Sequence, residues 1–289
     1  MAAPSPRSAS AASAGDKAGA GCLRVERVGL RTVVHTARAH SPLKLVLPKN
    51  HGDAAWCFVT SFGGGLVDGD ALDLDAEVGP NAKLLLATQA STKVYRSTGR
   101  GASQRFSADV GAGGLLVVLS DPVVCYEDAQ YTQLWDVKLA ADATLVVLDT
   151  LSAGRVARGE RWAFAHYVSS WRIARAGVPV LHDAQRLDRA DGPLGPRLEP
   201  FDALATVMAT GPLAADVVGR ITALGSAAPT RDCVCSWAPF ADADASAPTG
   251  ALGRIATRRL EDAVAIARGL LEPVSSASLL GDSPFARKW

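Results

Sequence analysis

Residues 61–100 decide the fold and read SFGGGLVDGDALDLDAEVGPNAKLLLATQASTKVYRSTGR. From Leu72 to Val78, apolar and charged residues alternate strictly, which is the pattern of a strand with one buried and one solvated face. A turn of Gly, Pro and Asn follows, and the apolar run at residues 82–87 predicts a returning strand that is more deeply buried. The stretch therefore predicts strands joined by a short turn in a mainly β protein.

A similar unit recurs along the chain. Small turn residues stand between an alternating segment and an apolar run at four places, which begin at Val78, Val110, Leu139 and Ile173 and follow one another at about thirty residues. Such spacing favours an elongated, solenoid-like (β-helix-like) stack of strands. Small turn residues between apolar strands also look alike in any all-β protein, so the repeat leaves an ordinary β architecture open.

The remaining segments extend this reading and place the helices late in the chain. Further strands are predicted at Leu23–Val34, Trp56–Thr60, Tyr131–Leu139 and Trp162–Arg175. About two helices are predicted in the C-terminal half, over Leu213–Leu224 with Gly225 as a cap and over Ile255–Leu271. Pro193–Pro200 predicts a loop, and Ala238–Gly250 predicts a polar, flexible insertion.

Composition predicts one globular domain over residues 21–289, with residues 1–20 as a disordered tail rich in Ala, Ser, Gly and Pro. A transit peptide remains the alternative for the tail. The formal net charge of +1 favours neither nucleic acid nor an anionic membrane as a partner. No run approaches the ~18 apolar residues of a membrane span. Five cysteines in 289 residues favour reduced thiols and a cytoplasmic location.

Familiar catalytic and metal-binding motifs are absent from the sequence. It contains no phosphate-binding loop, no nucleophile elbow and no zinc-protease helix motif. The five histidines show no zinc-ligand spacing. Cys233 and Cys235 would share one face of a strand and could bind a transition metal, but two ligands alone are a weak signal. No permanently bound cofactor is expected.

Two polar segments are the candidate functional residues. In the first, Gly63, Gly64 and Gly65 allow a tight bend or a close approach of the backbone, and Asp68 and Asp70 follow. The second, residues 149–162, reads DTLSAGRVARGERW and comes directly after a very apolar run. A polar loop held by a buried strand is the usual way in which a scaffold presents a site. The ordinary alternative is a solvated turn with an Arg–Glu pair.

Both segments resemble the urease accessory protein family UreD (also called UreH). The first matches its glycine run, Gly-Asp pair, alternating strand and polar motif, here Thr88-Gln89-Ala90-Ser91-Thr92-Lys93-Val94-Tyr95-Arg96-Ser97. The second is similar to the family's Asp, Gly-Arg and Arg-Gly-Glu pattern, here Asp149, Gly154, Arg155, Arg158, Gly159 and Glu160. The chain's end, residues 284–289, is also similar to the family's ending with Pro, Arg and Trp. The likeness runs from about Cys22 to Arg186 and weakens after that, which puts in doubt any partner contact placed in the last third.

The resemblance implies a scaffold and not an enzyme. Members bind apo-urease, join a UreF-like protein and a UreG-like GTPase, and assist delivery of nickel to the urease active site. The family fold is mainly β, with an extended stack of strands. The resemblance also implies transient passage of Ni²⁺ through an internal tunnel.

A hydrated cation that crosses a protein needs polar or anionic walls with exchangeable oxygen ligands. The acids expected beside such a path are Asp68, Asp70, Asp149 and Glu160, with neutral oxygens from Thr88, Gln89 and Thr92. The alternative is that these groups satisfy backbone atoms at turns and pair with Lys93, Arg96, Arg155 and Arg158. Replacement of Asp149 and Glu160 together would then lower nickel delivery and leave complex assembly intact.

Two other functions fit a stack of strands. One is a β-solenoid enzyme acting on polysaccharide, although the lack of a secretion signal and an aromatic content of 6% argue against a sugar-binding cleft. The other is a β-rich interaction module that handles no metal.

Overall fold

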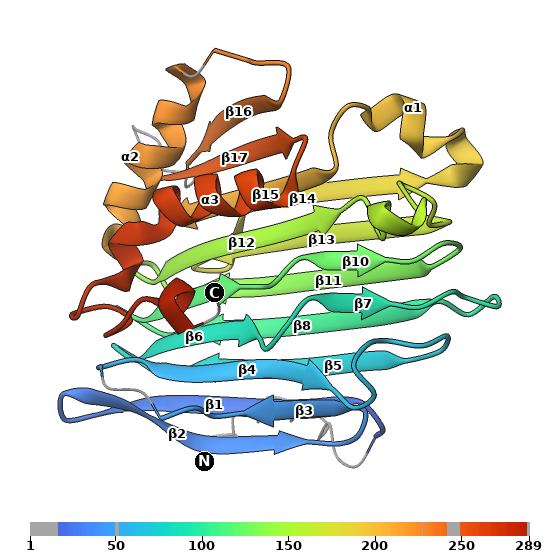
Figure 1. Cartoon of the computed structure of the whole chain (residues 1–289). Helices are drawn as coiled ribbons and strands as arrows, with labels where there is room; N and C mark the ends of the chain where they lie inside the picture. The colour runs from blue at the N-terminus through green and yellow to red at the C-terminus, as the bar shows by residue number, and fades with distance from the viewer. Residues whose placement is uncertain (1–16, 50–51, 227, 242–248, 288–289) are drawn as a thin grey trace, which may run out of the picture.

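Two β-sheets lie face to face in an elongated stack, with helices on one side (Figure 1). The structure is a computed structural model, and it describes residues 17–49, 52–226, 228–241 and 249–287. Sheet A has seven strands in the order β14 (Val178–Asp188), β13 (His166–Arg175), β11 (Gln130–Leu139), β8 (Ala102–Val110), β5 (Ala71–Val78), β1 (Ala20–Val28) and β2 (Arg31–Ala39). Sheet B has ten strands. Eight of them follow the order β16 (Cys233–Phe240), β17 (Gly250–Thr257), β15 (Ala203–Thr210), β12 (Thr144–Ser152), β9 (Leu115–Leu119), β6 (Lys83–Thr88), β4 (Ala55–Ser61) and β3 (Leu43–Val46). The short strand β10 (Val123–Cys125) pairs with β12, and β7 (Thr92–Val94) pairs with β10.

Between β4 and β13 the chain passes back and forth between the two sheets, and neighbouring strands within each sheet are parallel. The corners from sheet A to sheet B stack on one another, because the amide of Gly111 donates to the carbonyl of Val78 at 2.8 Å and the amide of Ala140 to that of Val110 at 2.9 Å. The recurring units that begin at Val78, Val110 and Leu139 are these corners. The prediction of a mainly β, solenoid-like stack is confirmed.

The fourth recurring unit, from Ile173, is not a corner. It is a hairpin in which β13 and β14 pair antiparallel within sheet A. Ala176 and Gly177 between them have φ angles of 48° and 82°, and two positive φ angles in succession are typical of the tightest hairpin turn. The regular coils therefore end at β13.

Antiparallel strands close both ends of the stack, and some strand bounds differ from the predicted ones. Residues 23–34 form two strands and not one, because Gly29 at a φ of 58° turns β1 back into β2. Trp162 has a φ of 54° and precedes β13, which begins at His166. Ala20 is already buried in β1, while residues 1–16 of the predicted tail lie outside the described residues.

The helices are α1 (Leu194–Leu198), α2 (Ala215–Ala223) and α3 (Leu260–Leu271), all in the C-terminal half. Helix α1 lies where the sequence predicted a loop. The predicted helix from Ile255 begins later, because pairing of β17 with β15 and β16 continues through Thr257. Gly225 does not cap α2 but continues it in a 3₁₀ turn.

Of the predicted insertion at residues 238–250, residues 242–248 lie outside the described residues. The 3₁₀ turns are η1 (Val156–Arg158), η2 (Arg189–Asp191), η3 (Pro212–Ala214), η4 (Leu224–Ser226), η5 (Glu272–Ser275) and η6 (Pro284–Arg287).

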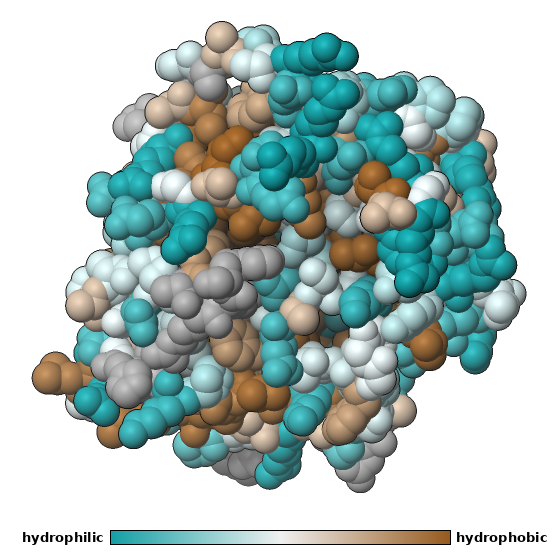
Figure 2. All heavy atoms as spheres, in the orientation of Figure 1, coloured by the Kyte–Doolittle hydropathy of each residue, from teal (hydrophilic) through white to brown (hydrophobic). Residues whose placement is uncertain are grey.

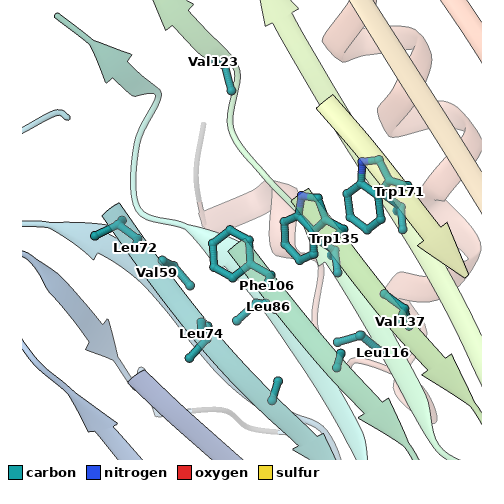
Figure 3. Packing of buried hydrophobic residues seen from close by; sticks show 14 of the residues in the cluster. Val59, Leu72, Leu74, Leu86, Phe106, Leu116, Val123, Trp135, Val137 and Trp171 are labelled. Atoms are coloured by element: carbon teal, nitrogen blue, oxygen red, sulfur yellow. The ribbon is translucent and has the colours of Figure 1, made fainter. Parts of the chain in front are cut away.

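The core has two layers. Between the sheets, Phe106, Trp135 and Trp171 occupy the same register on β8, β11 and β13 and stack with ring centroids 4.2 Å apart at each step (Figure 3). Stacked aromatic pairs stabilise by about 0.5–1.5 kcal/mol beyond their buried area. On the other face of sheet B, α2 and α3 bury a second apolar cluster that includes Ile221 and Leu271.

A buried arginine fastens one end of the coils. The Arg175 guanidinium donates to the carbonyls of Ala140, Ala141 and Ala143 at 3.2, 3.1 and 2.7 Å and to the Thr210 hydroxyl at 2.8 Å. All the acceptors belong to the corner after β11 or to β15, so this guanidinium joins the last regular coil to the C-terminal strands.

The surface is largely polar, with apolar patches between the helices and the lower strands (Figure 2). Hydrophilic atoms gather at the upper right of this view, where Figure 1 places α1 and the end of β14. Within the described residues, no helix combines the length and the apolar character needed to span a membrane.

Candidate functional site

A row of polar side chains crosses the interior of the stack at one register. Gln104, Gln133 and Ser169 are direct partners on β8, β11 and β13. They face sheet B, where the carboxylate of Asp149 on β12 accepts from Gln133 Nε2 at 2.7 Å and from Ser169 Oγ at 2.6 Å. All four side chains are buried. We call Gln104, Gln133, Ser169 and Asp149 the interior row.

Two tyrosines complete the hydrogen bonding of this row. The hydroxyl of Tyr131 donates to Gln104 Oε1 at 2.5 Å, and Gln133 Nε2 also lies 3.3 Å from the hydroxyl oxygen of Tyr167. Burial, together with the nearby Asp149 charge, raises the pKa of both tyrosines well above the ordinary value. Both phenols therefore stay protonated and act as neutral hydrogen-bonding groups.

The row continues toward the C-terminal strands. Thr206 on β15 is the register partner of Asp149, and Arg254 on β17 is the partner of Thr206. Arg254 forms an ion pair with Asp183 on β14, which lies in the opposite sheet. Burial raises the pKa of Asp183, the Arg254 charge opposes that shift, and Asp149 adds to it. This end of the row thus brings two carboxylates, Asp149 and Asp183, close to the partly exposed guanidinium of Arg254.

Two adjoining hollows lead from the surface to the interior row. The outer hollow, of about 460 Å³ including its open mouth, is lined by residues that include Gly64, Gly65, Thr92, Lys93 and Gln104. The second hollow, of about 350 Å³ including the open space beside it, shares Val59, Thr88, Thr92 and Gln104 with the first and adds Gln133 and Trp135. Trp135 Nε1 is buried without a hydrogen-bond partner in the part of the chain that the structure describes. The segment singled out in the sequence therefore lines the mouth of a hollow that reaches Gln104 of the row.

The glycine run shapes this mouth. Gly63 and Gly64 have φ angles of 87° and 74°, which side chains with a Cβ rarely adopt. A Cβ on Gly65 would lie 2.6 Å from the Tyr95 ring and 2.8 Å from the Lys93 carbonyl. The bend and the close approach expected of the three glycines are both present, and they hold the run against the Lys93–Tyr95 segment.

Asp68 and Asp70 lie in the turns of this edge and not in the row. The Asp68 carboxylate accepts from the hydroxyls of Ser97 and Thr98 at 2.6 and 2.8 Å and from the amides of Arg100 and Gly101 at 3.1 and 2.8 Å. These bonds hold the pKa of Asp68 well below its usual range. Asp70 accepts from the amide of Val67 at 2.9 Å, which closes a local turn.

Glu160 lies in a surface cluster that joins the two motifs. It is ion-paired with Arg155, whose hydrogen bonds lower the pKa of the Glu160 carboxyl. The Arg155 guanidinium lies 3.9 Å over the Tyr126 ring, and Tyr126 meets Tyr95 edge-on at 5.1 Å. The second motif therefore packs against the first, an arrangement that neither segment predicts alone.

The other motif residues have local roles at this edge. A Cβ on Gly154 would lie 2.7 Å from the Glu160 carbonyl, and Gly159 ends η1 at a φ of 80°. Arg96 pairs with Glu127 and Asp128, both at 3.0 Å. The Thr88 hydroxyl donates to Asp121 at 2.8 Å and also lines both hollows. Gln89 and Arg158 are exposed.

Of the four predicted acids, only Asp149 belongs to the row. The sequence reasoning missed the other members, Gln104, Gln133 and Ser169, together with Asp183 and Arg254. Among the described residues, no group of three or more His, Cys, Asp or Glu side chains could hold a metal ion in a closed site. The row offers carboxylate, amide and hydroxyl groups that come from four different strands.

Comparison with known proteins identifies the family. A sequence model of the family described as UreD urease accessory protein matches residues 17–289. The chain is 52% identical over 274 residues to Urease accessory protein UreD of Sorangium cellulosum (strain So ce56), covering 94% of this chain and 85% of that protein. It is 42% identical over 277 residues to the protein of that name from Anaeromyxobacter sp. (strain Fw109-5), covering 94% and 90%. It is also 34% identical over 210 residues to Urease accessory protein D of Oryza sativa subsp. indica, covering 71% and 69%.

The family match spans the solenoid, both polar motifs and the C-terminal helices alike. On these grounds, the chain belongs to the UreD family of urease accessory proteins.

Proposed function

We propose that this chain is a scaffold, not an enzyme, that binds apo-urease together with UreF-like and UreG-like partners and assists delivery of nickel to the urease active site. Membership of a urease accessory family supports the role in urease maturation. The proposal places this work in the cytoplasm, where a chain with five free cysteines keeps its thiols reduced. Nickel is cargo in this proposal, so no resident cofactor is needed.

The observation that carries the proposal is the interior row beneath the surface mouth. A divalent cation leaving water must meet oxygen ligands, because isolated charge in an apolar core is very costly. Asp149 supplies one negative charge, and the side chains of Gln104, Gln133 and Ser169 supply neutral oxygens one strand spacing apart. Ligands of this kind bind divalent ions weakly enough for exchange.

The Cys125 thiol, which lies near the row, does not make the row a tight metal-binding site. Cys125 is buried near the two tyrosines, and burial raises the pKa of its thiol far above the ordinary value. It therefore stays a neutral thiol, whereas tight soft-metal sites need thiolates. An oxygen-lined interior suits passage better than storage.

The test is urease activation in cells that co-express apo-urease with UreF- and UreG-like partners, with and without this chain. Urease activity and nickel per purified urease are measured together. Asp149→Asn in the row is compared with Asp136→Asn, an exposed carboxylate on the outer face of β11. Pull-down of the partners by each variant reports complex assembly.

We expect Asp149→Asn to lower bound nickel while the complex still assembles, and Asp136→Asn to behave as wild type. Glu160→Gln should act only through the surface cluster, so adding it to Asp149→Asn should lower nickel little further. Normal nickel loading with Asp149→Asn would overturn the path through the row. Normal activation without the chain would overturn the accessory role itself, and a requirement for the chain without any effect on bound nickel would favour a metal-free interaction module.

A further inference from the structure

Two cysteines lie outside everything assigned so far. Cys233 and Cys235 are on β16, the edge strand of sheet B, and their Sγ atoms are 3.6 Å apart. Both side chains are half-buried, and both thiols are free. Free cysteines are usually among the most buried residues and pack as small hydrophobic groups, whereas this pair is half-buried on an edge strand.

The pair lies on the opposite side of sheet B from the interior row. Residues two apart on a strand share a face, and Cys235 packs against the apolar cluster beneath α2 and α3. Trp237, the next residue on that face, lies against Gly225 in the turn after α2. The interior row lies between the two sheets, on the opposite face of sheet B, so sheet B separates the two sites.

The sulfur separation favours metal chelation over a disulfide. Two thiolates that bind one tetrahedral ion at about 2.3 Å each lie roughly 3.7 Å apart, close to the separation seen here. A disulfide needs sulfurs about 2.05 Å apart, much closer than the 3.6 Å seen here. Residues i and i+2 of a strand are about 6.6 Å apart, which is near the upper end of the Cα separations that disulfides span.

We propose that Cys233 and Cys235 form a two-thiolate site for a soft, thiophilic cation of the Zn²⁺ or Cu⁺ kind. Binding breaks two S–H bonds and forms two metal–sulfur bonds, and both protons pass to solvent. No third His, Cys, Asp or Glu joins them among the described residues, so the remaining coordination positions are left to solvent. The site therefore takes a metal without the closed shell of a structural zinc centre. The proposal does not rest on nickel passage, because it uses other residues on the other face of sheet B.

The test is a titration of the reduced full chain with Cd²⁺, a spectroscopically visible stand-in, and with Zn²⁺. We expect one Cd²⁺ per chain with a sulfur-to-metal absorption band. Cys233→Ser or Cys235→Ser should weaken binding by at least about tenfold and lower the band, and the double variant should remove it. Cys22→Ser, which removes a half-buried thiol on β1, is the matched control and should change neither.

A second readout separates lost ligands from lost folding. Bound metal should protect Cys233 and Cys235 of the wild-type chain, and not Cys22, from alkylation followed by peptide mapping. Equal weakening by Cys22→Ser, or an unchanged band in the Cys233→Ser and Cys235→Ser double variant, would overturn the proposal. Formation of an internal disulfide in the presence of Cd²⁺, with no metal band, would overturn it as well.

Discussion

The interior row and the aromatic stack occupy neighbouring registers of the same three strands. Gln104, Gln133 and Ser169 each lie two residues before Phe106, Trp135 and Trp171, and both sets point between the sheets. The stack stabilises mainly by burial and ring contact, and Trp171 Nε1 also donates a long hydrogen bond of 3.4 Å to the Asp149 carboxylate of the row. Every polar atom of the row needs a partner to offset its loss of water. One core thus contains an apolar register that holds the sheets together and a polar register that we propose lines the nickel path.

Truncating the stack should give the largest effect. Trp135→Ala should lower the free energy of unfolding by about 3–5 kcal/mol, because it removes the middle ring of the stack and leaves a cavity. Denaturant unfolding of the full chain measures this. Asp136→Ala, one residue away on the solvent face, should stay within about 0.5 kcal/mol of wild type. Similar losses for the two variants would mean that the stack does not hold the sheets together.

A buried polar group with a purely structural role should behave like the stack. Arg175→Met should cost about 2–3 kcal/mol, because it leaves three corner carbonyls and the Thr210 hydroxyl without their donor. Thermal and denaturant melts would show the loss. Arg172→Met, which changes an exposed arginine on the same strand, is the control. A stable Arg175→Met chain would show that other groups satisfy this corner.

Substitutions in the interior row should change stability little and nickel loading strongly, unlike substitutions in the aromatic stack. Gln133→Leu should change the free energy of unfolding by only about 1 kcal/mol, since Asp149 keeps its bond from Ser169 and the new side chain is apolar. Nickel bound by co-expressed urease should nevertheless fall several-fold. Unfolding and nickel content are measured on the same preparation. If Gln133→Leu destabilises as strongly as Trp135→Ala, the two registers do not differ in kind.

Asp68 should give the smallest effect and the one most sensitive to pH. Its folded pKa is depressed below the ordinary 3.8, so its contribution to stability is present above that value and is lost as pH falls toward the folded pKa. Asp68→Asn should melt below wild type at neutral pH, and the gap should narrow below about pH 4. Melting curves across this range test the sign. A gap that widens in acid would contradict the assignment.

The sequence predicted what local alternation determines. The segment from Leu72 to Val78 has the expected buried and exposed faces, and the corners recur where small turn residues indicated them. The same period of two also contains a signal that was overlooked. In residues 102–110 and 130–139 the buried phase is apolar except for Gln104 and Gln133, and a polar residue in a buried phase is what marks the row.

Other parts of the site depend on contacts that alternation does not reveal. Asp183 and Arg254 meet across the two sheets although 71 residues separate them. Asp68 and Asp70 were expected beside the path because they are acids, but short acids next to glycine also close turns with backbone amides. Local pattern indicates which face a side chain takes, whereas the partner that it meets depends on the whole stack.

The stacking of the corners also sets the spacing of the polar side chains along the interior row. Each coil adds one strand spacing of about 4.8 Å and one side chain to the interior row, since Gln104, Gln133 and Ser169 are register partners. In the proposed nickel path, an ion crossing the interior would therefore meet the next side chain of the row after each such spacing, and the number of coils that carry a row residue would set the number of steps. The number of stacked coils would thus set the length of the proposed path, and a chain with one coil more or fewer would have a longer or shorter path behind the same surface hollow.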